Sequence, residues 1–127
     1  MDICFEGVGQ TAATFLVEGE VTPGMVVTMT GNGTVGLGEA EDLPCGVMLG
    51  GVRGDAAAVQ IGGAAEVAYS GDTAPAAGWQ ELVLDGEGGV RLADKTADET
   101  TGKTAETGLL CLVLKVDTTA KTAVIKL

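Results

Sequence analysis

The sequence contains the same order of strands and turns twice. In residues 21–61 a small-residue turn ending in glycine starts an apolar strand, a glycine-rich turn follows, and a Val-x-Leu pair comes directly after it. Residues 74–127 repeat this order, with Val90 lying 55 positions after Val35 and Gly108 lying 62 positions after Gly46. The larger second offset indicates a loop inserted in the second copy. This repeat constrains the fold more than any single motif, because each copy should form the same supersecondary unit.

The segments between the turns favour β-strands. Short β-branched and apolar runs are bounded by glycines, and none of them has convincing helical periodicity. The sequence therefore predicts an all-β protein, a compact small β-barrel or sandwich with internal duplication, little helix and an extended N-terminal arm. We expect an arm and first strand in residues 1–20, followed by a β-domain in 21–127 made of two similar units, 21–70 and 74–127.

The composition indicates a core built from many small contacts. The chain has 127 residues, of which 46% are hydrophobic, but its only aromatic residues are Phe5, Phe15, Tyr69 and Trp79. Aromatic side chains bury the largest areas in protein cores, and two half-size lobes would each be marginally stable alone. We therefore expect association with copies of the same chain or with a larger surface.

The charge balance argues against several classes of partner. The net charge is −11 and the chain has no histidine. Phosphate-backbone binding needs clustered cations, so no nucleic acid is expected as a partner, and anionic membranes should repel the chain. No apolar run is long enough for a membrane-spanning helix, and the first ten residues lack the pattern of a signal peptide. Synthesis in the cytoplasm is the expectation.

Several short motifs resemble functional sites but are better explained as turns. Residues 31–36 match G-x-G-x-x-G, yet a β-like segment follows where a dinucleotide site needs a helix. Gly102-Lys103-Thr104 lacks the earlier glycine of a phosphate-binding loop, and Arg53-Gly54-Asp55 has the residue types of an ordinary turn. Residues 39–42 are acidic but lack calcium-ligand spacing.

The remaining residues nominate no catalytic centre. Without histidine there is no His-dependent triad, and no carboxylate or lysine pair is indicated by spacing. Cys4, Cys45 and Cys111 fit no metal pattern, and we interpret them as small buried hydrophobic residues. We expect no enzyme activity, no cofactor and no metal.

The order of these elements resembles one family of viral proteins. The residues that carry the resemblance are T-P-G-M-V-V, G-N-G-T-V and L-P-C-G-V-M-L in 22–49, V-Q-I-G-G-A-A-E-V-A in 59–68, A-G-W-Q-E-L-V-L-D-G-E-G-G-V-R-L in 77–92 and T-G-L-L-C-L-V-L in 107–114. In this order they are similar to the capsid cement, or head decoration, proteins of tailed bacteriophages. The chain departs from the pattern in the 94–107 insert and in Met25, which stands where an Asp is usual.

The resemblance implies a function and partners. It implies a homotrimeric virion protein on the outer capsid surface, made in the bacterial host cytoplasm, that clamps neighbouring subunits of the major capsid protein. Under this hypothesis Ile3, Phe5 and Val8 of the arm are candidate capsid or trimer contacts. Trp79 is a further candidate, although its sequence position is equally compatible with the core.

Two other functions remain open from the sequence. One is another structural β-module of the virion, associated with a tail or fibre. The other is a small ligand-binding β-barrel, which would need a deep pocket with convergent polar groups. The insert 94–107 should face solvent or a neighbouring molecule under any of these functions.

Overall fold

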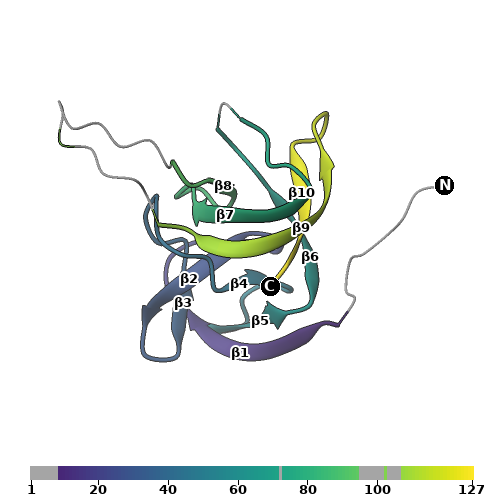
Figure 1. Ribbon diagram of the computed structural model, residues 1–127. Helices are drawn as coiled ribbons and strands as arrows, with labels where there is room; N and C mark the ends of the chain where they lie inside the picture. The colour runs from purple at the N-terminus through teal and green to yellow at the C-terminus, as the bar shows by residue number, and fades with distance from the viewer. Residues whose placement is uncertain (1–8, 72, 95–101, 103–106) are drawn as a thin grey trace.

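Ten β-strands make up two five-stranded sheets in the computed structural model, which describes residues 9–71, 73–94, 102 and 107–127. The first sheet is a closed barrel in the order β1-β3-β2-β4-β5, and the second has the order β6-β10-β9-β7-β8. Their bounds are β1 Thr11–Val17, β2 Val26–Gly31, β3 Thr34–Gly36, β4 Gly46–Met48, β5 Ala56–Gly62, β6 Ala64–Ala68, β7 Gly78–Leu84, β8 Val90–Leu92, β9 Leu109–Asp117 and β10 Thr122–Lys126. The described residues contain no helix, so the predicted all-β class is confirmed (Figure 1).

The two sheets have the same topology. In the barrel β2 lies between β3 and β4, and β4 pairs with β5; in the second sheet β7 lies between β8 and β9, and β9 pairs with β10. The first strand of each set, β1 or β6, then pairs antiparallel with the last. The internal duplication read from the sequence is therefore present in the strand order.

Backbone hydrogen bonds repeat between the copies at matching positions. The amide of Glu18 donates to the carbonyl of Val35 at 2.8 Å, and the amide of Ser70 donates to that of Val90 at 2.9 Å. In the barrel this contact belongs to the parallel β1–β3 pair, whereas in the second sheet Tyr69 and Val90 form an isolated parallel bridge. The second sheet thus has the same strand order as the barrel, but its two edges meet only at the bridge between Tyr69 and Val90.

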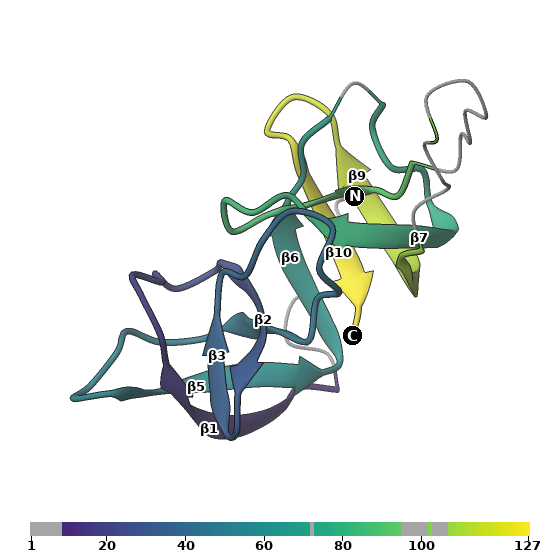
Figure 2. The same cartoon turned by 90° about the vertical axis from the view of Figure 1, so that its left-hand side faces the viewer.

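Strand pairing places the boundary between the two sheets at Gly63, earlier in the chain than the boundary between the predicted units 21–70 and 74–127. The stretch Ala64–Ala68, which we assigned to the end of the 21–70 unit, is β6 and pairs with β10 of the second sheet. The strand Thr11–Val17, which we grouped with the arm, closes the barrel. The two sheets contain β1–β5 and β6–β10, and Gly63 connects β5 to β6 (Figure 2).

Alternating residues of β2 connect two hydrophobic cores. Val27 points into the barrel, where it packs with the buried residues Val21, Val35, Met48, Ala57 and Val59. Its neighbour Val26 belongs to the core of the second sheet, together with Val47 of β4. Successive side chains of a strand point to opposite faces, so the outer face of β2 and β4 packs against the second sheet and forms part of its core. The two units therefore share buried surface and should unfold together.

Polar groups also tie the units at their junction. Gln60 is buried, and its Nε2 donates to the carbonyls of Gly62 at 2.9 Å and Ala64 at 3.0 Å. The amide of Leu127 donates to the carbonyl of Gly63 at 2.8 Å, which brings the C-terminus back to the junction (Figure 1). These bonds satisfy polar groups that the shared core takes out of water.

The second sheet has a contact with the barrel at a position that pairs β1 with β3 in the barrel. In the barrel the carbonyl of Gly33 accepts from the amide of Leu16, within the β1–β3 pair. The matching carbonyl, that of Gly88, accepts instead from the amide of Val26 of the barrel at 2.9 Å. The carbonyl of Gly88 therefore bonds to the first unit, whereas its counterpart Gly33 bonds within its own sheet.

Candidate interaction surfaces

The most exposed large apolar side chains of the second sheet lie on its outer face. Trp79 of β7 is 62% exposed and Leu110 of β9 is 59% exposed. Trp79 pairs directly with Leu112, and Leu112 pairs with Lys126 of β10, so these side chains share one face across three strands. We call Trp79, Glu81, Leu110, Leu112 and Lys126 the Trp79 face.

The opposite face of the same strands forms the core. Cys111 and Val113 alternate with Leu110 and Leu112 and are buried in the second hydrophobic cluster. The structure thus resolves the position of Trp79, which belongs to the surface. Leu110 and Leu112 were not predicted as surface residues. Residues 109–114 are all apolar, so the sequence does not show which side of the strand faces solvent.

The other candidate contacts cannot be compared with Trp79. Ile3, Phe5 and Val8 lie outside the described residues, as does most of the 94–107 insert. Of the four predicted contact residues only Trp79 lies in the described part of the chain, where it shares a face with Leu110 and Leu112 of β9.

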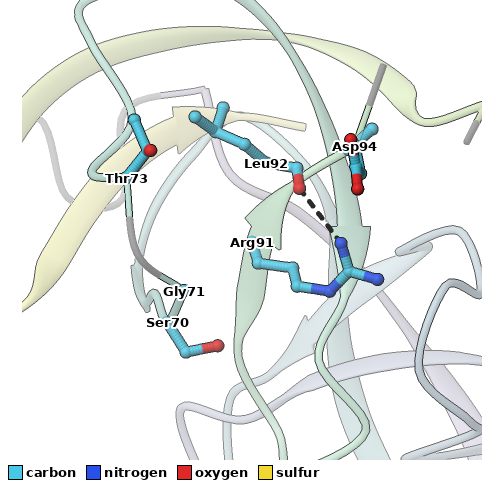
Figure 3. A pocket seen from close by; sticks show the side chains of 7 residues that line it. Ser70, Gly71, Thr73, Arg91, Leu92 and Asp94 are labelled. Carbon is cyan, nitrogen blue, oxygen red and sulfur yellow. Dashed lines mark hydrogen bonds between the residues drawn. The ribbon is translucent and has the colours of Figure 1, made fainter. Parts of the chain in front are cut away.

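A polar surface groove of about 450 Å³ lies where the edges of the second sheet meet (Figure 3). Ser70, Gly71 and Thr73 line one side, and Arg91 and Asp94 line the other. The guanidinium of Arg91 donates to the carbonyl of Leu92 at 3.2 Å and lies 3.8 Å from the carboxylate of Glu41. Arg91 thereby connects β8 to the loop of the first unit.

The described residues offer little to a metal or an enclosed ligand. Across residues 9–71, 73–94, 102 and 107–127, no three His, Cys, Asp or Glu side chains are placed to hold a metal ion. The barrel interior is filled by the valines and Met48 of its own core. In the part of the chain that is described, no helix has the length and hydrophobicity needed to cross a membrane.

Burial makes Cys111 a protected thiol. Cys111 is 3% exposed, and desolvation raises the pKa of its thiol. We expect iodoacetamide at pH 8 to modify Cys111 only slowly in the folded protein and readily in urea, because thiolate is the reactive form. Because folding raises the pKa of this thiol, its ionisation favours the unfolded state. The free energy of unfolding should therefore fall as the pH rises above the ordinary pKa of a cysteine thiol. Peptide mass spectrometry measures the two rates, and equal rates would contradict the burial.

Comparison with known proteins gives no assignment. The chain matches no model of a known protein family, and no curated protein matches it significantly.

Proposed function

We propose that this chain is a bacteriophage capsid decoration protein, a homotrimer that binds the outer surface of the assembled head. There it stabilises contacts between subunits of the major capsid protein, and it has no catalytic activity. The observation that carries this proposal is the Trp79 face, where a tryptophan and two leucines occupy the outer side of a sheet in a protein of net charge −11.

Exposed aromatic and leucine side chains on one sheet are suited to a protein interface. Tryptophan is enriched among the residues that contribute most to binding, and it is 62% exposed here. A shell presents many equivalent sites, so a modest contact at each subunit of a trimer gives strong overall retention. The resemblance in the order of strands and turns supplies the class of partner.

The alternatives receive less support. A ligand-binding barrel needs a cavity, and the barrel here is filled by Val27, Val35 and Met48. A tail or fibre module would use the same surface, so only its position on the particle distinguishes it from a decoration protein. Cryo-electron microscopy of labelled particles makes that distinction.

The proposal is tested by binding to empty expanded heads assembled from the cognate major capsid protein. We expect wild-type protein to sediment with heads and to elute as a trimer in size exclusion with light scattering. Trp79→Ser should weaken head binding or trimerisation by about tenfold or more, since loss of a central aromatic contact costs about 2 kcal/mol.

Leu16→Ser is the matched control, because Leu16 is 51% exposed on β1 of the barrel and lies on the other sheet. It should leave both measurements unchanged. A wild-type chain that stays monomeric and ignores expanded heads would rule out the proposed function.

A further inference from the structure

The hairpin between β2 and β3 turns at an asparagine that is followed by a glycine. Asn32 and Gly33 lie between Gly31, the last residue of β2, and Thr34, the first residue of β3. Both are exposed, and Asn32 is the only asparagine of the chain. A main-chain nitrogen that follows asparagine is placed to attack the side-chain carbonyl and close a five-membered ring. Glycine hinders this attack least, because it has no β-carbon.

Both reacting groups of this turn are free of hydrogen bonds within the described part of the chain. The amide of Gly33 donates to no backbone carbonyl, and the side chain of Asn32 makes no hydrogen bond. The hydroxyl of Thr34 donates to the main-chain carbonyl of Asn32 at 3.1 Å and so does not restrain the side chain. Nothing lies within 4 Å of a β-carbon placed at Gly33, which shows that the turn is uncrowded there.

The hairpin between β7 and β8 supplies a comparison inside the same molecule. It contains Asp85-Gly86, the only Asp-Gly pair of the chain, which is capable of closing the same ring. Here the carboxylate is held. Its Oδ1 accepts from the amides of Glu87 at 2.7 Å and Gly89 at 3.0 Å, and its Oδ2 accepts from the hydroxyl of Ser70 at 3.1 Å. The carboxyl group must leave these bonds before the nitrogen of Gly86 reaches it.

We propose that Asn32 is a site of spontaneous deamidation in the folded protein. The nitrogen of Gly33 bonds to the side-chain carbonyl carbon of Asn32 and gives its proton to solvent, and the side-chain nitrogen leaves as ammonia. Water then opens the cyclic imide at either carbonyl carbon, which yields aspartate or isoaspartate. The reaction consumes one water, releases one ammonia and adds one negative charge. It requires no partner, so it does not rest on the proposed function.

The isoaspartate product affects the closure of the barrel. It inserts an extra carbon atom into the main chain directly before Gly33, whose carbonyl accepts from the amide of Leu16 at 2.9 Å. Leu16 of β1 pairs with Thr34 of β3, in the parallel pair that closes the barrel. Isoaspartate should therefore weaken this bond, whereas aspartate keeps the length of the main chain and should leave it intact.

The test follows both sites in the full-length protein at mildly alkaline pH, folded in buffer and unfolded in guanidinium chloride. Peptide mass spectrometry combined with an isoaspartate-specific methyltransferase measures the product at each position. We expect isoaspartate at residue 32 in the folded protein. Folding should slow its formation at Asp85 at least about tenfold more than at Asn32, because three hydrogen bonds must open first.

Two variants separate the chemistry from the restraint. Asn32→Gln should stop the reaction at position 32, because the longer side chain closes only a six-membered ring, which forms more slowly. Ser70→Ala removes one of the three bonds to Asp85. It should speed isoaspartate formation at position 85 about fivefold in the folded protein and leave the rate at Asn32 unchanged.

Hydrogen exchange distinguishes the effect of main-chain length from that of charge. In isoaspartyl protein isolated by ion exchange, the Leu16 amide should exchange about fivefold faster than in unmodified protein, as expected for the loss of one hydrogen bond. Asn32→Asp is the matched control, because it adds the same charge to a main chain of normal length. It should keep the original exchange rate.

Three results would overturn the inference. Modification of Asn32 in guanidinium chloride but not in buffer would show that the folded turn prevents the reaction. Equal slowing of the two sites on folding would show that the bonds to Asp85 make no difference. Equal exchange of the Leu16 amide in isoaspartyl and unmodified protein would exclude an effect on barrel closure.

Discussion

Gly46→Ala should lower the free energy of unfolding by about 3 kcal/mol, the upper part of the usual range for overpacking a core. Gly46 lies in β4, and a β-carbon there would sit 2.5 Å from the carbonyl oxygen of Gln60 and 2.7 Å from Cγ1 of Val59. The first neighbour is backbone of β5, so it can move away only by breaking the pairing of β4 with β5. Urea denaturation followed by circular dichroism measures the change.

Gly50→Ala is the matched control for this effect. Gly50 follows β4 by two residues, and nothing lies within 4 Å of a β-carbon placed there. The same chemical change should therefore alter stability by less than about 0.5 kcal/mol. Equal stability of the two variants would mean that β4 and β5 are not packed as described.

Leu82→Ala should destabilise the protein by a similar amount, about 3 kcal/mol. Leu82 lies in β7 and is fully buried in the core of the second sheet, where its removal leaves a cavity. Because Val26 and Val47 of the barrel belong to the same core, the barrel should unfold in the same transition. Fluorescence of Trp79, the only tryptophan, reports the second sheet, and amide signals of β1 and β5 report the barrel.

Leu110→Ala provides the comparison, since Leu110 is 59% exposed on neighbouring β9. We expect a change below about 0.5 kcal/mol from the same truncation at the surface. If the two sheets of Leu82→Ala unfolded at different urea concentrations, the shared core would not couple them.

Much of the fold could be predicted because glycine and apolar residues repeat in a fixed order. Gly33 and Gly88 both adopt positive φ, at 63° and 94°, after strands β2 and β7. Turns of this kind favour glycine, so they can be recognised in sequence without structural information. The first strand of each copy is likewise flanked by glycines of positive φ, Gly9 and Gly19 around β1 and Gly63 and Gly71 around β6, yet the sequence prediction started each copy only after this strand.

The candidate surfaces were far less predictable. Trp79 could be identified as a residue of interest but could not be assigned to core or surface, and Leu110 and Leu112 lie in an apolar run. The exposure of Met29, a large apolar side chain of β2, was not predicted at all. Met29 is part of an ordinary strand pattern, and its exposure depends on where β4 begins and on the path of the 39–42 loop.

By itself the sequence determined that this protein is a duplicated β-structure, because glycine turns and short apolar strands are local features with local causes. Tertiary structure alone decided how the copies differ. The carbonyl of Gly88 accepts from the amide of Val26 in the other unit, and the amide of Glu41 in the first unit donates to the carbonyl of Leu84 in the second. These differences depend on contacts between residues distant in the chain, which an alternation of apolar residues does not encode. They turn two similar units into one shared core with two distinct surfaces.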